Sequence, residues 1–190
     1  MKYFYHKKEG YSLVEVLVAV ALLMFAIVGP MTIAVKSSQS AQYAREQNTA
    51  FFLAQEGISI INAIRNDNAL AVYKSTATDS WAWIDTPSLA PCKNSYGCTI
   101  DAVDGTFLNN VTSCENPTNC TLSYVETAVR GVYRVDSDGG TPETPFRRII
   151  TLQEITPDEV LVTSKVEWRA RVLGGDQTIT LSTSLFNAFK

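Results

Sequence analysis

The hydrophobic and polar positions divide the chain into three parts, and the first is an uncharged apolar run. Residues 16–35 include no formal charge in twenty consecutive positions. As a helix, that run would be about 30 Å long, enough to cross the apolar core of a bilayer. Lys2, Lys7 and Lys8 precede it, which places the N-terminus on the cytoplasmic side. The pattern predicts a membrane-spanning helix over residues 11–35.

The second part, residues 36–68, is amphipathic. Its apolar positions recur at steps of three and four, whereas the opposite side of the helix is polar. We expect the helix to end near Asn66, Asp67 and Asn68, whose side chains compete for backbone hydrogen bonds. The apolar stripe should pack inside the molecule. It comprises Ala44, Phe51, Ala54, Ile58 and Ile61, with Gly57 and Ile64 at its flanks.

The third part, residues 69–190, loses the helical period and alternates in the manner of strands. Residues 159–172 place Val160, Val162, Val166, Trp168 and Val172 on one face and charged or hydroxyl residues on the other. The sequence predicts an α+β fold, in which a long N-terminal helix packs its second half against an antiparallel sheet. The expected strands are 81–84, 99–103, 121–135, 146–155, 159–172 and 177–186, with a turn at 174–176.

Four cysteines form two copies of one spacing, Cys92 with Cys98 and Cys114 with Cys120. Four cysteines allow three pairings. The two local pairings are favoured because each closes a short loop that contains turn-forming residues. Such disulfides imply an oxidising compartment. Four free thiols are the alternative, and a zinc site fits less well because chelating pairs usually have two residues between the cysteines rather than five.

Charge and composition exclude several kinds of chemistry. The chain has 19 acidic and 16 basic residues, so a surface that binds nucleic acid is not expected. Its one histidine, His6, lies before the apolar run, and no nucleotide-binding or zinc-protease motif occurs. We therefore expect no catalytic residue, no cofactor and no enzyme.

Two short charged motifs have plain explanations. Residues 136–140, with the sequence DSDGG, have the acidic spacing of a calcium loop but lack its distal glutamate, so an Asp/Gly turn is favoured. Arg147 and Arg148 could contact an acidic partner. A solvated strand end is the favoured interpretation of that pair.

Glu15 is the residue that an ordinary membrane anchor does not explain. A carboxylate at the start of an apolar segment is costly to bury without a partner. Cleavage between Gly10 and Tyr11 would create a charged amine on Tyr11, with Glu15 as the fifth residue of the cleaved chain. In an assembly of axially shifted helices, one subunit's amine could neutralise the next subunit's Glu15. A signal anchor with an accidental glutamate is the alternative.

The N-terminal residues resemble a known family signature. A short basic leader that ends in Gly10, then Tyr11 and the segment SLVEVL, resembles the start of type IV pilins and pseudopilins, in which the first mature residue is usually Phe. The resemblance implies that a membrane peptidase cleaves after Gly10 and methylates the new terminus, and that Glu15 serves assembly. It also implies that the helix loosens at Pro30 in a filament. Residues 146–187 more weakly resemble the terminal hairpins of minor pilins.

These observations lead to one expectation and two alternatives. The expected protein has a leader at 1–10, a membrane and filament-core helix at 11–35, an amphipathic helix at 36–68 and a β-rich head at 69–190. It would be a minor pilin-like structural subunit of a type IV pilus or related filament. Its partners would be a prepilin peptidase, other pilins, the pilus assembly machinery and the membrane. It would span the inner membrane once before it enters an extracellular filament.

The alternatives concern the same kind of protein in another role. One is a pseudopilin of a type II secretion system. The other is a filament-tip binding module for adhesion or DNA uptake, of which DNA uptake is disfavoured by the acidic composition.

Overall fold

The computed structural model describes residues 10–74, 83–84, 87–101, 111–126, 131–135, 143–171 and 174–187. The chain divides into two compact units, Met1–Gln42 and Tyr43–Lys190. We describe each unit by itself and call the second one the head.

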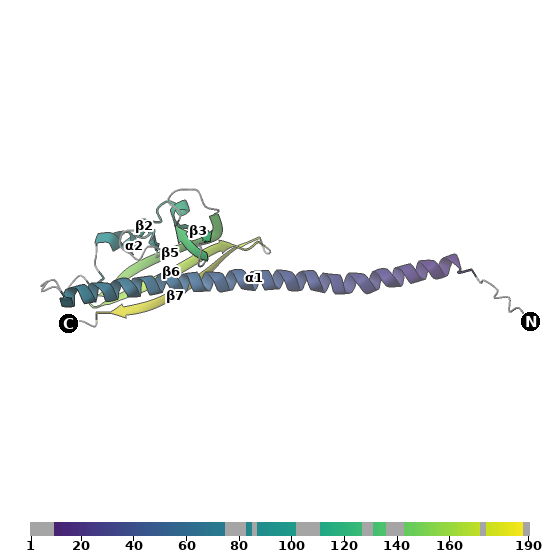
Figure 1. Ribbon diagram of the computed structural model, residues 1–190, viewed down its shortest axis with the longest axis horizontal. Helices are drawn as coiled ribbons and strands as arrows, with labels where there is room; N and C mark the ends of the chain where they lie inside the picture. The colour runs from purple at the N-terminus through teal and green to yellow at the C-terminus, as the bar shows by residue number, and fades with distance from the viewer. Residues whose placement is uncertain are drawn as a thin grey trace, which may run out of the picture. The chain divides into compact units, whose positions relative to one another are not determined.

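One long helix dominates the N-terminal part of the chain. Helix α1 (Leu13–Lys74) contains Pro30 in its interior and is drawn as a single coiled ribbon in Figure 1. The expected end of the helix near Asn68 is wrong, because α1 continues to Lys74. Asn68 does not compete for its own backbone: its Nδ2 donates to the carbonyl oxygen of Trp83 at 3.3 Å. Ala69, the next residue, is buried. Tertiary contacts thus extend the helix beyond the predicted turn.

The head contains an antiparallel sheet of seven strands among the described residues. The strands are β1 (Cys98–Ile100), β2 (Val111–Ser113), β3 (Thr121–Glu126), β4 (Gly131–Val135), β5 (Glu143–Thr156), β6 (Glu159–Arg169) and β7 (Asp176–Phe186). Three short helical turns accompany them, which are η1 (Pro87–Leu89), α2 (Ala90–Lys93) and η3 (Pro117–Cys120).

Strand β5 is the centre of this sheet. One of its edges pairs with β6 along nearly the whole strand, and β6 pairs in turn with β7. The other edge is shared, because β1 pairs with β5 at Ile150 and β3 pairs with it between Glu143 and Arg147. Strands β2 and β4 then extend β1 and β3 outward. The α+β fold expected from the sequence is therefore confirmed.

The predicted alternation of β6 is also confirmed. Every second residue of β6 from Val160 to Trp168 is buried. The buried set includes Ser164, a polar residue between Val162 and Val166. Strand β7 begins and ends within a residue of the expectation, and the predicted turn before it contains Gly174, whose φ is +66°.

The core lies between α1 and the inner face of the sheet. One cluster joins Ile60, Ile61 and Ile64 of α1 to residues of β1, β5, β6 and β7 and to Trp83. A second cluster joins Ala50, Leu53 and Ala54 to Phe146 and Trp168, among others. Each fully buried large apolar side chain contributes roughly 1.5–3 kcal/mol to folding. The helix is therefore attached to the sheet along several turns.

The buried face of α1 differs in part from the predicted stripe. Ala54, Ile61 and Ile64 are buried as expected, but Phe51 and Ala44 are exposed. The reason lies at Gly57, where a Cβ atom would come within 2.5 Å of the Ser164 hydroxyl oxygen. The helix approaches the sheet most closely at this glycine, so the buried face is centred there rather than on the larger apolar residues.

Two short strand predictions are corrected. Trp83 and Ile84 form a turn rather than a strand, and both side chains are buried in the first cluster. The strand expected at 99–103 is found as β1, which ends at Ile100. Residues 81–82 and 102–103 lie outside the described residues. The first prediction is therefore wrong, whereas the second is confirmed in part, as a short and fully buried strand.

Candidate functional site: the N-terminal segment

The candidate site begins just before α1. Gly10 and Tyr11 precede the helix and are exposed. A Cβ atom at Gly10 would meet no other atom within 4 Å. The first helical hydrogen bond runs from the amide of Val16 to the carbonyl oxygen of Ser12 at 3.2 Å. Among the described residues, none lies close enough to Gly10 to meet an added side chain there.

Glu15 occupies the first turn of α1. A carboxylate there interacts favourably with the partial positive charge at a helix N-terminus, by roughly 0.3–1 kcal/mol. The spacing from Ser12 to Glu15 is that of a capping box. Neither side chain, however, makes a hydrogen bond or ion pair with a residue that the structure describes. The Glu15 carboxylate is therefore available to a partner from outside the chain.

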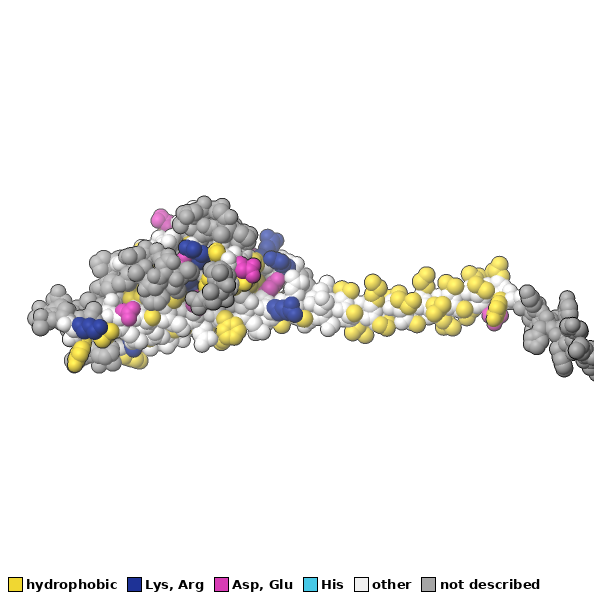
Figure 2. All heavy atoms as spheres, in the orientation of Figure 1, with side chains coloured by type: hydrophobic (Ala, Val, Ile, Leu, Met, Phe, Trp, Pro, Cys, Tyr) yellow, Lys and Arg dark blue, Asp and Glu magenta, His cyan; other side chains and the backbone are white. Residues whose placement is uncertain are grey.

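The rest of this segment is an exposed apolar surface. On the face of α1 that Figure 2 shows, hydrophobic side chains follow one another along the N-terminal part of the helix. In the apolar part of this helix, an 18-residue window has a mean hydropathy of 2.6 and none of it is buried. The helix is long and apolar enough to cross a membrane. The large exposed side chains are Leu13, Val14, Val16, Leu17, Val18, Val20, Leu22, Leu23, Met24, Phe25, Ile27, Val28, Met31, Ile33 and Val35.

Pro30 lies within this surface without ending the helix. The helix continues on both sides of the proline. The hydroxyl of Thr32 donates to the carbonyl oxygen of Gly29 at 2.8 Å, close to the place where a proline removes a helical donor. The loosening at Pro30 that the family resemblance implies for a filament stays a prediction.

The comparison with protein families decides how these features are interpreted. Residues 5–29 match the prokaryotic N-terminal methylation motif. The match includes Gly10, Tyr11, Glu15 and much of the apolar run, and it is consistent with a type IV pilin-like or pseudopilin-like protein. The family is structural rather than enzymatic, and its motif implies, in general, a prepilin peptidase and other pilins as partners. The motif and the apolar helix together indicate membrane anchoring.

The match covers only the N-terminal segment. The comparison with curated proteins found no match, and the comparison with solved structures found none either. The architecture of the head, with a long helix against an antiparallel sheet, is nevertheless pilin-like.

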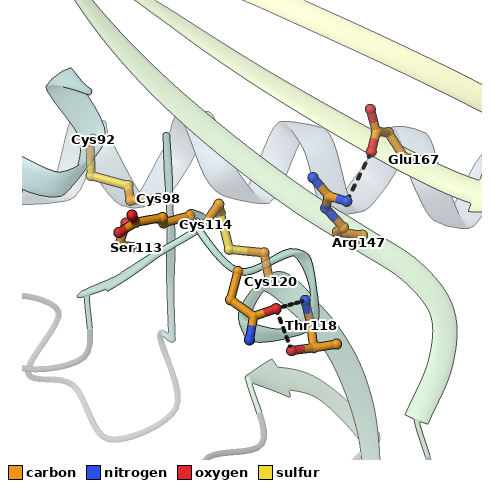
Figure 3. Close-up of a disulfide and its surroundings, with 10 residues drawn as sticks. Cys92, Cys98, Ser113, Cys114, Thr118, Cys120, Arg147 and Glu167 are labelled. Carbon is orange, nitrogen blue, oxygen red and sulfur yellow. Dashed lines mark hydrogen bonds and ion pairs between the residues drawn. A yellow bond between two sulfur atoms is a disulfide. The ribbon is translucent and has the colours of Figure 1, made fainter. Parts of the chain in front are cut away.

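The cysteine pairing expected from the sequence is confirmed. Cys92 is bonded to Cys98 and Cys114 to Cys120 (Figure 3). Gly97 has a φ of +70° in the first loop and accepts a hydrogen bond from the amide of Cys114. A side chain at Gly97 would also come within 2.8 Å of the Ile150 carbonyl oxygen. The first loop therefore needs glycine at this position.

Other sequence-predicted features fall outside the described part or find no support there. The acidic motif at 136–140 lies outside the described residues. Within the part that the structure describes, no group of three or more His, Cys, Asp or Glu residues could hold a metal ion.

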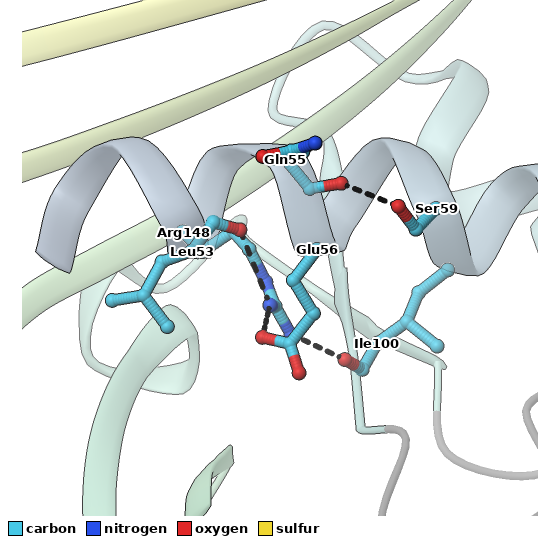
Figure 4. Close-up of polar contacts among 6 residues, drawn as sticks. All are labelled: Leu53, Gln55, Glu56, Ser59, Ile100 and Arg148. Carbon is cyan, nitrogen blue, oxygen red and sulfur yellow. Dashed lines mark hydrogen bonds and ion pairs between the residues drawn. The ribbon is translucent and has the colours of Figure 1, made fainter. Parts of the chain in front are cut away.

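The favoured interpretation of Arg148 as a solvated strand end is wrong. Its side chain is only 1% exposed and points toward α1 (Figure 4). One guanidinium nitrogen donates to the Glu56 carboxylate at 2.6 Å, and the other donates to the carbonyl oxygen of Ile100 at 2.7 Å. The sequence did hold a signal for this burial, because Arg148 shares the inner face of β5 with Phe146 and Ile150.

Proposed function

We propose that the chain is a minor pilin-like structural subunit of a type IV pilus or a related extracellular filament. The observation that carries the proposal is the methylation-motif match, with Glu15 as the sole charged residue of an exposed apolar segment. Such a segment needs either lipid or neighbouring helices around it. A filament core supplies those helices once the subunit leaves the membrane.

Glu15 has a specific role in this proposal. A prepilin peptidase cleaves after Gly10, and the new amine of Tyr11 carries a positive charge. Inside a bundle of apolar helices, neither that amine nor the Glu15 carboxylate can be buried alone at low cost. Contact between one subunit's amine and its neighbour's Glu15 pairs the two opposite charges, so that neither is buried alone. It also fixes the axial register of adjacent subunits, since any other shift would leave two buried charges unpaired.

Processing and topology follow from the segment before α1. Gly10 is exposed and has no contacts that an added side chain would disturb, so the peptidase can reach the bond after it. The lysines of the leader hold that end on the cytoplasmic side of the inner membrane. The head, with its two disulfides, then lies on the oxidising side. The subunit spans the membrane once before assembly moves it into the filament.

The assembly role of Glu15 is tested by substitution in the native host. Glu15→Ala should leave cleavage intact but reduce the subunit in sheared surface filaments by at least about tenfold, the effect of one unpaired buried charge. Glu15→Asp, which keeps the charge, is the matched control and should retain more incorporation than Glu15→Ala. Normal filament entry by Glu15→Ala would contradict the pairing.

Mass spectrometry on the filament and membrane fractions tests processing. A peptide that begins at Tyr11 with one extra methyl group is expected in sheared filaments, whereas Gly10→Leu should accumulate uncut. A cut Gly10→Leu chain would remove the peptidase step from the proposal. A mature Tyr11 form confined to membranes would favour the pseudopilin of a type II secretion system instead.

A further inference from the structure

The outer face of the sheet, the face of β5 and β6 that points away from α1, has two hollows with one residue in common. Arg147 lines both. The first hollow has a volume of about 490 Å³, and the second about 500 Å³. Both volumes are in the range of sites for small molecules. Arg147 lies on this face because successive side chains of β5 alternate and its neighbour Arg148 points inward.

Arg147 has hydrogen-bond donors that no described residue uses. Its Nε atom is buried and has no partner. The nearest carboxylate belongs to Glu167, at 3.8 Å from a terminal nitrogen of Arg147, which is too long for a hydrogen bond (Figure 3). Glu167 forms an ion pair with Arg147 through one carboxylate oxygen and a second, at 2.9 Å, with Lys165 through the other. The two terminal nitrogens of Arg147 make no hydrogen bond to a described residue, so they remain as donors toward the hollows, whereas Nε is buried.

Hydroxyl groups form much of the rest of the lining. Thr121 and Thr178 line the first hollow, as does Thr144, whose hydroxyl already donates to the carbonyl oxygen of Leu122. Ser95 and Thr151 are among the residues that line the second hollow. A hydroxyl both donates and accepts, which suits a ligand that is itself rich in hydroxyls.

Aromatic and charged residues narrow the class of ligand further. Tyr96, at the second hollow, is 58% exposed and offers the apolar face of its ring. The carboxylates of Glu115, Glu167 and Asp176 line the hollows and balance the cations there, so the lining lacks the positive excess that a polyanion such as nucleic acid needs. A saccharide whose carboxylates are spaced one to a sugar ring is still accommodated, because the terminal nitrogens of Arg147 can bind one of them in a bidentate manner.

We propose that the outer face of the sheet binds an acidic saccharide, with a carboxylate on Arg147 and a sugar ring in each hollow. The hydroxyls of the lining bind the sugar hydroxyls, and Tyr96 stacks on one ring. Lys165 remains paired to Glu167 and keeps that carboxylate away from the ligand. The site goes beyond the filament role, because binding requires only the head. A failure to bind would leave the filament proposal intact.

The test uses the purified full chain in a detergent without a sugar head group. Calorimetric titration with digalacturonate should show binding that weakens as salt increases. A neutral disaccharide of the same size, lactose, should bind at least about tenfold more weakly, because it lacks the carboxylate that Arg147 binds. No detectable binding of digalacturonate at millimolar concentration would overturn the proposal.

Variants then assign the binding to this face. Arg147→Gln should weaken digalacturonate binding by at least about tenfold, whereas Arg65→Gln, on the exposed side of α1, should not change it. Thr151→Val removes a hydroxyl without a change of charge and should weaken binding by about three- to tenfold. It also serves as the test if Arg147→Gln fails to fold, which circular dichroism would reveal.

Two outcomes would contradict the assignment. If Arg147→Gln folds and binds digalacturonate like the unmodified chain, the ligand does not lie on this face. If a glutamate-rich peptide binds more tightly than digalacturonate and loses binding with Arg147→Gln, the face is a site for acidic peptides and the saccharide proposal is wrong.

Discussion

The N-terminal segment exposes its large apolar side chains, whereas the head buries many of its own in a core. Before Gln42, the large apolar side chains are exposed, and the one carboxylate among them has no partner among the described residues. In the head, apolar side chains of α1 and the sheet bury one another, and the buried charge of Arg148 is paired within the chain. The head is therefore complete as a folded unit. In the proposed function, a membrane or neighbouring helices cover the apolar side chains of the N-terminal segment.

Arg148 provides the largest expected effect in the head. Arg148→Met leaves the Glu56 carboxylate and the Ile100 carbonyl oxygen without their donors. We expect the free energy of unfolding to fall by about 3 kcal/mol, the low end for a broken buried pair, because the Glu56 side chain is 38% exposed. Denaturant titration of the full chain in detergent, followed by tryptophan fluorescence, measures it.

The neighbouring arginine is the matched control for this prediction. Arg147→Met changes the same type of side chain on the opposite face of β5, where the guanidinium is partly exposed. Its effect on unfolding should stay below about 1 kcal/mol. An equal loss of unfolding free energy in the two variants would contradict the prediction that burial against α1 makes Arg148 the more important of the two arginines.

The two disulfides should differ in their contribution to stability. Each closes a loop with a sequence separation of six, worth about 2 kcal/mol in the chain-entropy account. Cys92 and Cys98 also belong to the large core cluster, whereas Cys114 and Cys120 are clustered with Ile149 alone. Replacement of both cysteines by alanine should therefore lower the free energy of unfolding by up to about 1 kcal/mol more in the first loop than in the second. Identical midpoints of thermal unfolding would contradict this.

Sequence patterns predicted the parts of the fold that depend on a regular spacing of residues along the chain. The period of two in β6 and β7 gave their bounds nearly correctly, and the uncharged run gave the apolar helix. The equal spacing of the cysteines, together with their turn residues, led to the correct pairing. In each case the signal is local, because neighbours in the sequence determine the structure.

The predictions made from the sequence are wrong where residues that are distant in the sequence determine the local structure. The helix continues past Asn68 because Trp83 accepts its side-chain hydrogen bond, and Phe51 is exposed because Gly57 sets the closest approach to Ser164. Glu56, the partner of Arg148, lies on another element altogether. In the candidate site, the sequence alone identified Gly10, Tyr11 and Glu15, since that motif depends on consecutive residues. The two hollows at Arg147 could not be foreseen, because residues from four strands and two separate turns form them.

Gly57 in the head and Gly29 in the N-terminal segment allow the same substitution to be compared in a packed and in an exposed part of α1. Gly57→Ala places a methyl group against the Ser164 hydroxyl and the Arg148 and Ile150 side chains, so we expect a loss of about 1–2 kcal/mol. Gly29→Ala meets no atom within 4 Å and should leave the unfolding of the head unchanged while it favours the helix. Ser164→Ala combined with Gly57→Ala should recover part of the loss, and equal effects of the two single variants would contradict the close approach.

The smallest expected effect concerns Tyr133 in the head. Burial raises the pKa of its hydroxyl, and the charge that neighbouring Tyr124 acquires at high pH raises it further. A pKa that is higher in the folded than in the unfolded chain adds stability that is fully present below about pH 10. That stability is lost as the pH rises through the raised value. Tyr133→Phe should therefore reduce the decline in stability at alkaline pH.

Alkaline titration by tyrosinate absorbance, together with denaturant unfolding at each pH, measures this effect. Tyr124→Phe is the informative companion, since it removes the second cause but leaves the burial. The rings of Tyr124 and Tyr133 are in edge contact at 5.2 Å between centroids. Tyr133 should then titrate at a lower pH than in the unmodified chain but still above an unfolded tyrosine. An unchanged titration of Tyr133 in that variant would mean that burial alone sets its pKa.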